Sequence, residues 1–112
     1  MMKRYCLALD LVDDPVLIAA YEHWHQRENG WPEIRQSILD AGIASMEIYR
    51  TGNRLLMVLE ANEHFCFNKK AAMDAANPRV RQWEELMGKF QQPLPWAKQG
   101  EKWTLMEMIF QL

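Results

Sequence analysis

The sequence lacks the patterns that mark several common classes of protein. Only two of its 112 residues are cysteines, Cys6 and Cys66, and they form no CxxC pair. A zinc or redox site therefore has no support, and we expect both to be buried thiols. The chain also has no GxSxG turn, glycine-rich phosphate loop or HExxH pair, which argues against the hydrolases, nucleotide-binding proteins and metallopeptidases that those motifs define.

Long apolar runs and a surplus of basic charge are missing as well. The longest apolar runs have the length of a strand, far below the roughly 20 residues of a membrane span. The net charge is −2 and the pI is about 5.9, so nucleic acid is not an expected partner. The basic start, Met1 to Arg4, leads into a short apolar run that Asp10 interrupts, which does not fit a signal peptide. We expect a cytoplasmic protein with no membrane contact.

What is present suits one globular unit. A chain of 112 residues with 49% hydrophobic residues can bury a core without disulfides or metals, and we expect a single domain over residues 1–112. Five tryptophans are many for this length. Such rings either fill a core or form the floor of a site for flat, apolar-faced ligands such as sugars.

Periodicity and turn signals predict eight elements. Strands are expected at residues 3–11, 43–50, 54–60 and 103–110, and the turn Thr51-Gly52-Asn53 joins the second strand to the third. Asp14-Pro15, Trp31-Pro32 and Asn77-Pro78 are typical helix starts, Asn62 is a further candidate cap, and Gly42 is a typical helix end. Helices are expected at about residues 15–27, 32–41, 63–75 and 78–90, with a loop at 91–100.

With each helix pair counted as one crossover, the order is β-α-β-β-α-β. This order predicts an α+β, ferredoxin-like fold with a four-stranded antiparallel sheet. Helices on one face leave the other face of the sheet bare. We expect a second copy to cover it, giving a symmetric homodimer of the dimeric α/β barrel type.

The densest group of polar and aromatic residues lies between Tyr21 and Glu33. On a helix, Tyr21 and His25 stand one turn apart on the same face, and the loop that follows carries Trp31. An imidazole titrates near neutrality, so His25 is the best candidate for a proton-transfer group, although a structural histidine is the commoner case. His23 lies on another face, so no metal site with His25 is expected, and His64 suits a surface or capping role.

Three further residues have a simple structural interpretation beside a functional one. Trp83 falls on the apolar face of the helix predicted at 78–90, so periodicity alone favours a core residue. Glu84 then lies at the flank of that helix. Met46 on the second strand is most simply a core side chain.

Several of these segments together resemble the L-rhamnose mutarotase family. The resemblance runs through Tyr21-Glu-His-Trp-His25, Trp31-Pro32-Glu33, Asp40-Ala41-Gly42, the hairpin from Met46 to Leu56, the stretch Gln82 to Met87 and a last strand with Glu107 and Phe110. It covers nearly the whole chain, and the Tyr-x-x-x-His pair followed by Trp-Pro-Glu is its most specific part.

The resemblance implies a small cytoplasmic dimer with a ferredoxin-like fold that interconverts the α and β anomers of a 6-deoxy sugar without a cofactor. His25 matches the family's proton-donating histidine, Tyr21 its substrate-binding tyrosine and Trp83 the first of a tryptophan pair. The second tryptophan of that pair is Glu84 here, and a further substrate-contacting tyrosine is Met46.

The loop from His25 to Trp31, through Gln26 to Gly30, is two residues longer than in the family. With Glu84 and Met46 it lies where the sugar would be held. The sequence looks closer to a branch associated with L-fucose than to the L-rhamnose enzymes, and Trp31 and Trp83 suit the apolar face and methyl group of a deoxy sugar.

Two other functions stay open at this point. Small dimeric ferredoxin-like domains also host cofactor-free oxygenases and haem-related enzymes, an alternative that rests on fold analogy alone. A non-catalytic sugar-binding module is the other.

Overall fold

A computed structural model describes residues 1–112 and is built around three long antiparallel strands. They are β1 (Lys3–Leu11), β2 (Ile43–Thr51) and β3 (Arg54–Ala61). β1 pairs with β3 from Lys3↔Ala61 to Asp10↔Arg54, and β3 pairs with β2 through the tight turn that contains Gly52. These three predicted strands are confirmed to within a residue at each end.

The free edge of β1 is occupied by two very short strands. β4 (Gln91–Gln92) pairs with the end of β1, and β5 (Thr104–Leu105) pairs with its middle, so that the order is β2-β3-β1-β4 with β5 also on β1. The loop predicted at 91–100 therefore begins as a strand. The strand predicted at 103–110 is wrong beyond Leu105. The Met106 amide still donates to the Cys6 carbonyl, but the residues after it pair with no strand of this chain.

Four helices connect the strands: α1 (Pro15–Trp24), α2 (Pro32–Asp40), α3 (Phe67–Ala76) and α4 (Pro78–Gly88). The predicted proline starts of α1, α2 and α4 are confirmed. The Asp14 carboxylate accepts the amides of Val16 and Leu17, and the Asn77 side chain caps α4 in the same way. These side chains satisfy donors that have no partner inside the helix.

Three predicted helix boundaries are wrong. α1 ends at Trp24 instead of residue 27, because His25 is its C-cap and the chain turns there. α3 begins at Phe67 instead of 63. The Asn62 side chain accepts the His64 amide in a local turn. Cys66 is the N-cap residue of α3, and its side chain makes no capping hydrogen bond. α4 ends at Gly88 instead of residue 90.

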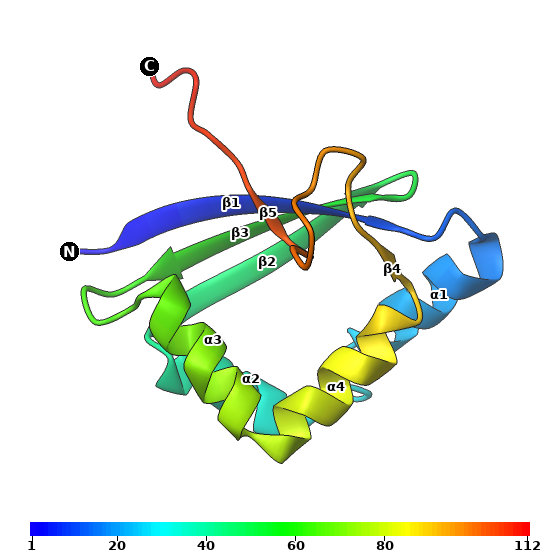
Figure 1. Ribbon diagram of the computed structural model, residues 1–112, viewed down its shortest axis with the longest axis horizontal. Coiled ribbons are helices and arrows are strands. Elements are labelled where there is room, and N and C mark those ends of the chain that lie inside the picture. The colour runs from blue at the N-terminus through cyan, green and yellow to red at the C-terminus, as the bar shows by residue number, and fades with distance from the viewer.

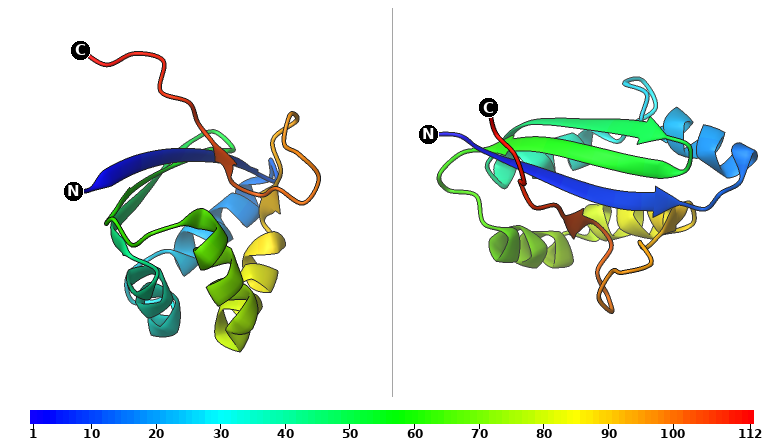
Figure 2. Two further views of the ribbon diagram at one scale, coloured as in Figure 1. Left: turned by 60° about the vertical axis from the view of Figure 1, so that its left-hand side comes forward. Right: turned by 90° about the horizontal axis from the view of Figure 1, so that it is seen from above.

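All four helices cover the same face of the sheet (Figures 1 and 2). The core lies between these two layers and includes Leu9 and Leu11 of β1, Ile43 of β2 and Leu55 of β3, the largest fully buried side chains. On the other side of the sheet the last residues extend away from the body, as both figures show. The predicted α+β, ferredoxin-like architecture is confirmed.

The two cysteines are less buried than the sequence suggested. Cys6 on β1 is half-buried, and Cys66 at the start of α3 is exposed. The expectation of two buried thiols rested on the apolar character of free cysteine, and it is wrong for Cys66, which lies at the N-cap of α3.

None of the four helices has both the length and the hydropathy that a membrane span requires.

A glycine between α2 and β2 allows the chain to reverse there. Gly42 has φ +100°, and a Cβ at this position would lie 2.7 Å from Asn62 Oδ1 and 3.3 Å from the Phe65 nitrogen. Both the backbone conformation and the space therefore disfavour any side chain.

Replacing Gly42 by alanine should lower the free energy of unfolding by about 1–3 kcal/mol. Gly88→Ala is the matched control, because a Cβ there meets nothing closer than Lys102 Nζ at 3.9 Å and φ is not positive. Gly88→Ala should be neutral or slightly stabilising. Urea denaturation of both variants tests this, and equal midpoints would show that Gly42 is not required for the turn.

Candidate active site

A cavity of about 620 Å³ lies between the sheet and the helices. Its wall is mostly apolar and comes from all three long strands and all four helices. The volume falls within the roughly 300–1,000 Å³ usual for small-molecule sites. Six residues singled out in the sequence line this one cavity: Tyr21, His25, Trp31, Met46, Trp83 and Glu84.

His25 lies at the end of α1, and two contacts fix its ring. Its Nδ1 is 2.7 Å from the carbonyl oxygen of Tyr21. A carbonyl only accepts, so Nδ1 carries the proton and donates it, and in the neutral ring Nε2 keeps its lone pair. The ring also packs on Tyr21, with ring centroids 4.2 Å apart. The geometry therefore selects one tautomer and leaves Nε2 as the nitrogen free to accept a proton.

The surroundings of His25 favour its neutral form. As a whole residue it is exposed, because its backbone lies at a helix end, but Tyr21 and Trp83 pack against its ring. This burial lowers the pKa of His25 below its ordinary value of 6.5, and the bond to the Tyr21 carbonyl opposes the shift only in part. At neutral pH His25 is therefore an uncharged imidazole with an available base.

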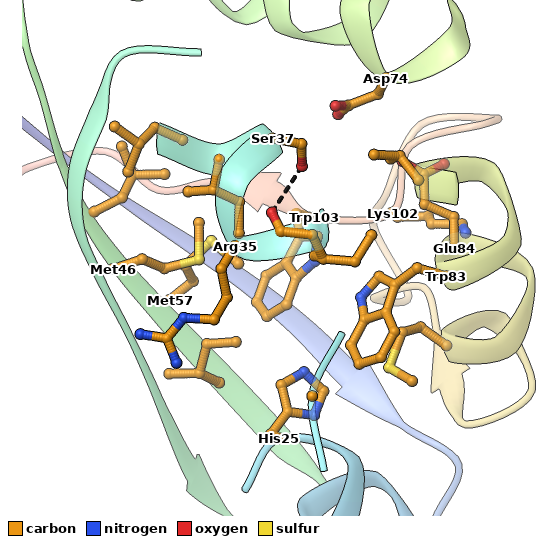
Figure 3. A pocket seen from close by; sticks show the side chains of 18 of the residues that line it. His25, Arg35, Ser37, Met46, Met57, Asp74, Trp83, Glu84, Lys102 and Trp103 are labelled. Carbon is orange, nitrogen blue, oxygen red and sulfur yellow. Dashed lines mark hydrogen bonds between the residues drawn. The ribbon is translucent and has the colours of Figure 1, made fainter. Parts of the chain in front are cut away.

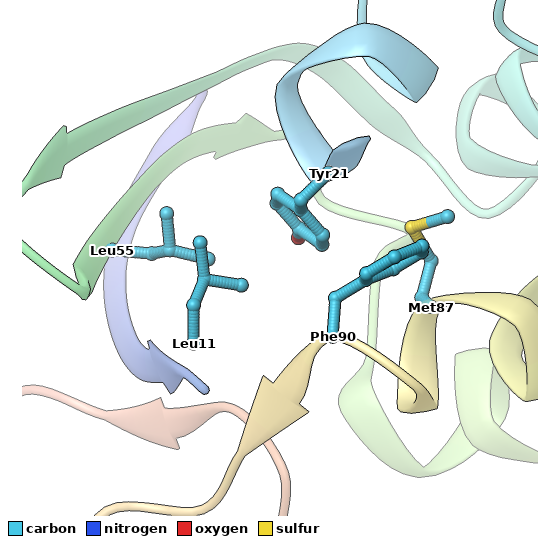
Figure 4. Packing of buried hydrophobic residues seen from close by; sticks show 5 residues of the cluster. All are labelled: Leu11, Tyr21, Leu55, Met87 and Phe90. Atoms are coloured by element: carbon cyan, nitrogen blue, oxygen red, sulfur yellow. The ribbon is translucent and has the colours of Figure 1, made fainter. Parts of the chain in front are cut away.

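Tyr21 connects the cavity to the core. It is 3% exposed and packs with Leu11, Leu55, Met87 and Phe90 (Figure 4). Its hydroxyl oxygen accepts the Gln91 side-chain N–H at 3.4 Å, so its own proton remains available to an acceptor. Burial raises the pKa of Tyr21 above its ordinary 10.0, and the phenol stays protonated. Tyr21 is thus a rigid hydrogen-bond donor beside His25.

Two tryptophans continue the wall from His25. Trp83 on α4 meets the His25 ring edge to face at 5.7 Å, and Trp31 meets Trp83 in the same manner at 5.2 Å. Arg79 lies over the Trp31 ring at 3.7 Å, and its Nε donates to Glu33 Oε2 at 3.3 Å. The start of α2 is thereby held against α4. Trp83 is half-buried. The sequence left open whether it is a core residue or a site residue, and in the structure it packs against the core and also lines the cavity.

Met46 reaches the cavity because of a bulge in β2. Ile43 pairs with Ala61, whereas Ser45 already pairs with Glu60, so Ala44 is an extra residue. A bulge reverses which side chains face the helices. Ile43 before it and Met46 after it therefore both face inward. Glu84 is exposed on α4 and lies on the opposite side of the pocket from Met46 (Figure 3).

The other two histidines lie away from this site. His23 is exposed and contacts Trp24 and Asn29, and His64 is exposed beside Glu63. Neither lines the cavity. No three His, Cys, Asp or Glu side chains are grouped so that they could hold a metal ion.

Several polar residues of the cavity were missed in the sequence: Arg35, Ser37, Lys70, Asp74 and Lys102. Lys70 and Asp74 have the spacing of a helical ion pair, a signal that was available. Which way that pair faces depends on where α3 begins, and that start was predicted four residues too early. Arg79 follows Pro78 at a helix start, and nothing in its local sequence connects it with Trp31.

A family model and two relatives match nearly the whole chain. The sequence model of a protein family, described as L-rhamnose mutarotase, matches residues 4–112. A protein named L-fucose mutarotase from Xanthomonas campestris pv. campestris is 48% identical over 111 residues, which covers 99% of this chain and 89% of that protein. A UPF0734 protein of Dictyostelium discoideum is 35% identical over 117 residues and covers 98% and 90%, respectively.

Solved structures of the same fold are more distant in sequence. The L-rhamnose mutarotase of Formosa agariphila superposes with a TM-score of 0.71 at 20% identity over 98% of both chains. Tetracenomycin F2 cyclase of Streptomyces glaucescens gives 0.63 at 16% identity over 98% of this chain and 96% of that one. These two similarities concern the fold alone. The match to the family model over nearly the whole length and the 48% identical relative show that this chain belongs to the L-rhamnose mutarotase family, a family of isomerases.

Proposed function

We propose that this protein interconverts the α and β anomers of a 6-deoxyhexose, with L-fucose as the preferred sugar, and that His25 carries the proton. The observation that supports this most is the neutral His25 ring, held in one tautomer against Tyr21, in an aromatic-walled cavity. The 48% identity to a protein named L-fucose mutarotase supports the choice of sugar.

Mutarotation requires only that a proton moves between two oxygens. In the proposed step His25 Nε2 takes the proton of the anomeric hydroxyl, the bond between C1 and the ring oxygen breaks, and C1 becomes an aldehyde. The imidazolium then gives its proton to the former ring oxygen. Rotation about the bond from C1 to C2 and the reverse sequence close the ring as the other anomer. His25 is thus first base and then acid, which agrees with the proton-donating role that the resemblance implies.

The neighbours of His25 suit this sequence. Tyr21 keeps its proton, so it would hold a sugar oxygen by donating a hydrogen bond without itself ionising. Trp31 and Trp83 supply an apolar wall for the ring face and methyl group of a deoxy sugar. The lowered pKa of His25 ensures that the base is free at neutral pH.

We also propose that the protein acts as a homodimer. The chain exposes 8036 Å², about 1,500 Å² more than the roughly 6,500 Å² expected of a compact monomer of its mass. Much of the exposed apolar surface lies in the last residues, where Met108, Ile109 and Phe110 are 71%, 94% and 77% exposed. This segment and the helix-free face of the sheet would cover the same surfaces of a second copy. The two unpaired thiols fit the cytoplasm that we propose as its compartment.

The exchange rate between anomers tests the catalytic proposal. Saturation-transfer NMR on L-fucose and L-rhamnose should show enzyme-dependent exchange that His25→Gln lowers by about 10²- to 10⁴-fold. His23→Gln is the control, because His23 lies two residues away but outside the cavity, and it should exchange anomers within twofold of the unmodified protein. Exchange of both sugars at the buffer rate would refute the mutarotase, and saturable binding at that rate would indicate a sugar-binding module instead.

The pH dependence follows from the lowered pKa of His25. Protonation of Nε2 removes the base, so activity is lost as the pH falls through the pKa of His25. Because that pKa lies below 6.5, kcat/KM should decline with a midpoint below pH 6.5. Measuring buffer-corrected exchange from pH 4.5 to 8.5 checks this. A midpoint at or above 6.5, or the same decline in His25→Gln, would contradict the assignment.

The proposed dimer predicts the mass in solution. Sedimentation equilibrium should give about twice the 13.3 kDa of one chain, and the double variant Ile109→Asp, Phe110→Asp should shift the protein toward one chain, because the charges would be buried at the interface. Val16→Asp is the control, since Val16 is 76% exposed on α1, away from the sheet's free face, and should leave the mass unchanged. A 13.3 kDa species at micromolar concentration would rule the dimer out.

A further inference from the structure

An ion pair on α3 faces the same cavity as His25 and is used by nothing in the proposed proton transfer. Lys70 Nζ lies 2.6 Å from Asp74 Oδ2, and both residues line the cavity. Asp74 and His25 lie at opposite sides of the pocket (Figure 3). The two ends of the cavity therefore differ in chemistry: a neutral ring is at one end and a charged pair at the other.

This pair is unusually withdrawn from water for this protein. The Lys70 and Asp74 side chains are 23% and 16% exposed, whereas every other ion pair has at least one side chain that is 43% exposed or more. Removing two charges from water carries a desolvation cost that a single contact repays only in part. An ion pair on the exposed face of a helix carries little of that cost. The half-buried position of the Lys70–Asp74 pair therefore suggests a role beyond stabilising the helix.

Both partners line the cavity and keep unused hydrogen-bonding capacity. Asp74 Oδ1 makes no hydrogen bond, and only one partner takes a proton of the Lys70 ammonium. Asp74 Oδ1 is also accessible to solvent: every buried side-chain oxygen or nitrogen has a hydrogen-bond partner, and this atom has none. The pair thus presents an acceptor and a donor side by side, which is the pattern that two neighbouring hydroxyl groups require.

We propose that Lys70 and Asp74 bind a vicinal pair of ring hydroxyls of the sugar and so determine which sugar is accepted. One hydroxyl donates to Asp74 Oδ1, and its neighbour accepts from Lys70 Nζ, while the anomeric centre lies at His25. This inference rests on the proposed mutarotase function and adds the residues that select the substrate. Glu84 and Lys102 line the same cavity but are exposed, so water competes with them more strongly.

The test compares two identical chemical changes. Asp74→Asn removes the charge inside the cavity. Asp40→Asn removes the same charge from an exposed helical aspartate that also has one partner four residues away, the Gln36 amide at 2.8 Å. With the sugar that the unmodified protein exchanges fastest, Asp74→Asn should raise KM about 10- to 100-fold with kcat within about threefold. Asp40→Asn should match the unmodified protein.

Monodeoxy sugars separate binding from a structural role. For the analogue that lacks the hydroxyl bound by Asp74, the unmodified protein and Asp74→Asn should have equal KM values, whereas for the other analogues the penalty should persist. Lys70→Met should behave likewise toward the neighbouring hydroxyl, which provides a second variant if one folds poorly.

Three results would overturn the inference. An unchanged KM in Asp74→Asn would show that the carboxylate does not bind the sugar, and an equal penalty on every analogue would show that the pair acts only on the structure. If the unmodified protein exchanged no sugar at all, the proposed function itself would fail, and this inference with it.

Discussion

The hydrogen bond from His25 Nδ1 to the carbonyl of Tyr21 is the interaction on which the site depends. It forms because α1 ends at Trp24, so the Tyr21 carbonyl accepts from a side chain at the helix end, where carbonyls lack backbone partners. One bond of 2.7 Å thus completes the helix, fixes the tautomer and lays the imidazole on the phenol. Had the helix continued to residue 27, the His25 amide would have competed with the imidazole for that carbonyl.

Tyr21 in turn depends on the sheet. Its ring is buried against Leu11 and Leu55 of two neighbouring strands and against Phe90 after α4. The catalytic candidate is therefore attached through one rigid side chain to the larger of the two buried clusters. From His25 the ring contacts continue to Trp83, Trp31 and Arg79. This series of contacts connects α1, α2 and α4 and gives the cavity a fixed wall, as a site that must hold a small ligand requires.

Local signals in the sequence were enough to predict most elements. The starts at Pro15, Pro32 and Pro78 and the end at Gly42 follow from backbone chemistry within a few residues, and the long strands follow from alternation. The segment 106–110 also alternates, yet it is no strand, because the chain leaves the edge of β1 after the bond from the Met106 amide to the Cys6 carbonyl and pairs with no other strand (Figure 1). Asn62 has the composition of a helix cap, but its side-chain oxygen Oδ1 accepts the His64 amide in a local turn instead.

The site was predictable in part for the same reason. Tyr21 and His25 lie within one turn, so their meeting could be anticipated, and the Trp-Pro start placed Trp31 nearby. Arg79 contacts Trp31 from another element, and the Lys70–Asp74 pair lies within α3 but faces a cavity that all four helices line. Both orientations depend on how α3 and α4 pack. The bulge at Ala44, which keeps both Ile43 and Met46 facing the helices, leaves no signal in a simple alternating pattern.

If the protein is the proposed mutarotase, its choice between sugars must come from polar groups. L-Fucose and L-rhamnose have the same atoms and one methyl group each, and they differ only in the configuration of hydroxyls. An aromatic wall cannot distinguish them strongly, whereas hydrogen bonds to hydroxyls can. By the resemblance to the family, Glu84 would add a carboxylate where a tryptophan is expected, whereas Met46 would remove a tyrosine hydroxyl. The loop from His25 to Trp31 also reaches the cavity: Gln26 and Arg27 line it, and the Asn29 side chain donates to the His23 carbonyl. Together with Lys70 and Asp74, these residues line the same cavity as His25, the proposed proton-transfer group, with hydrogen-bonding groups.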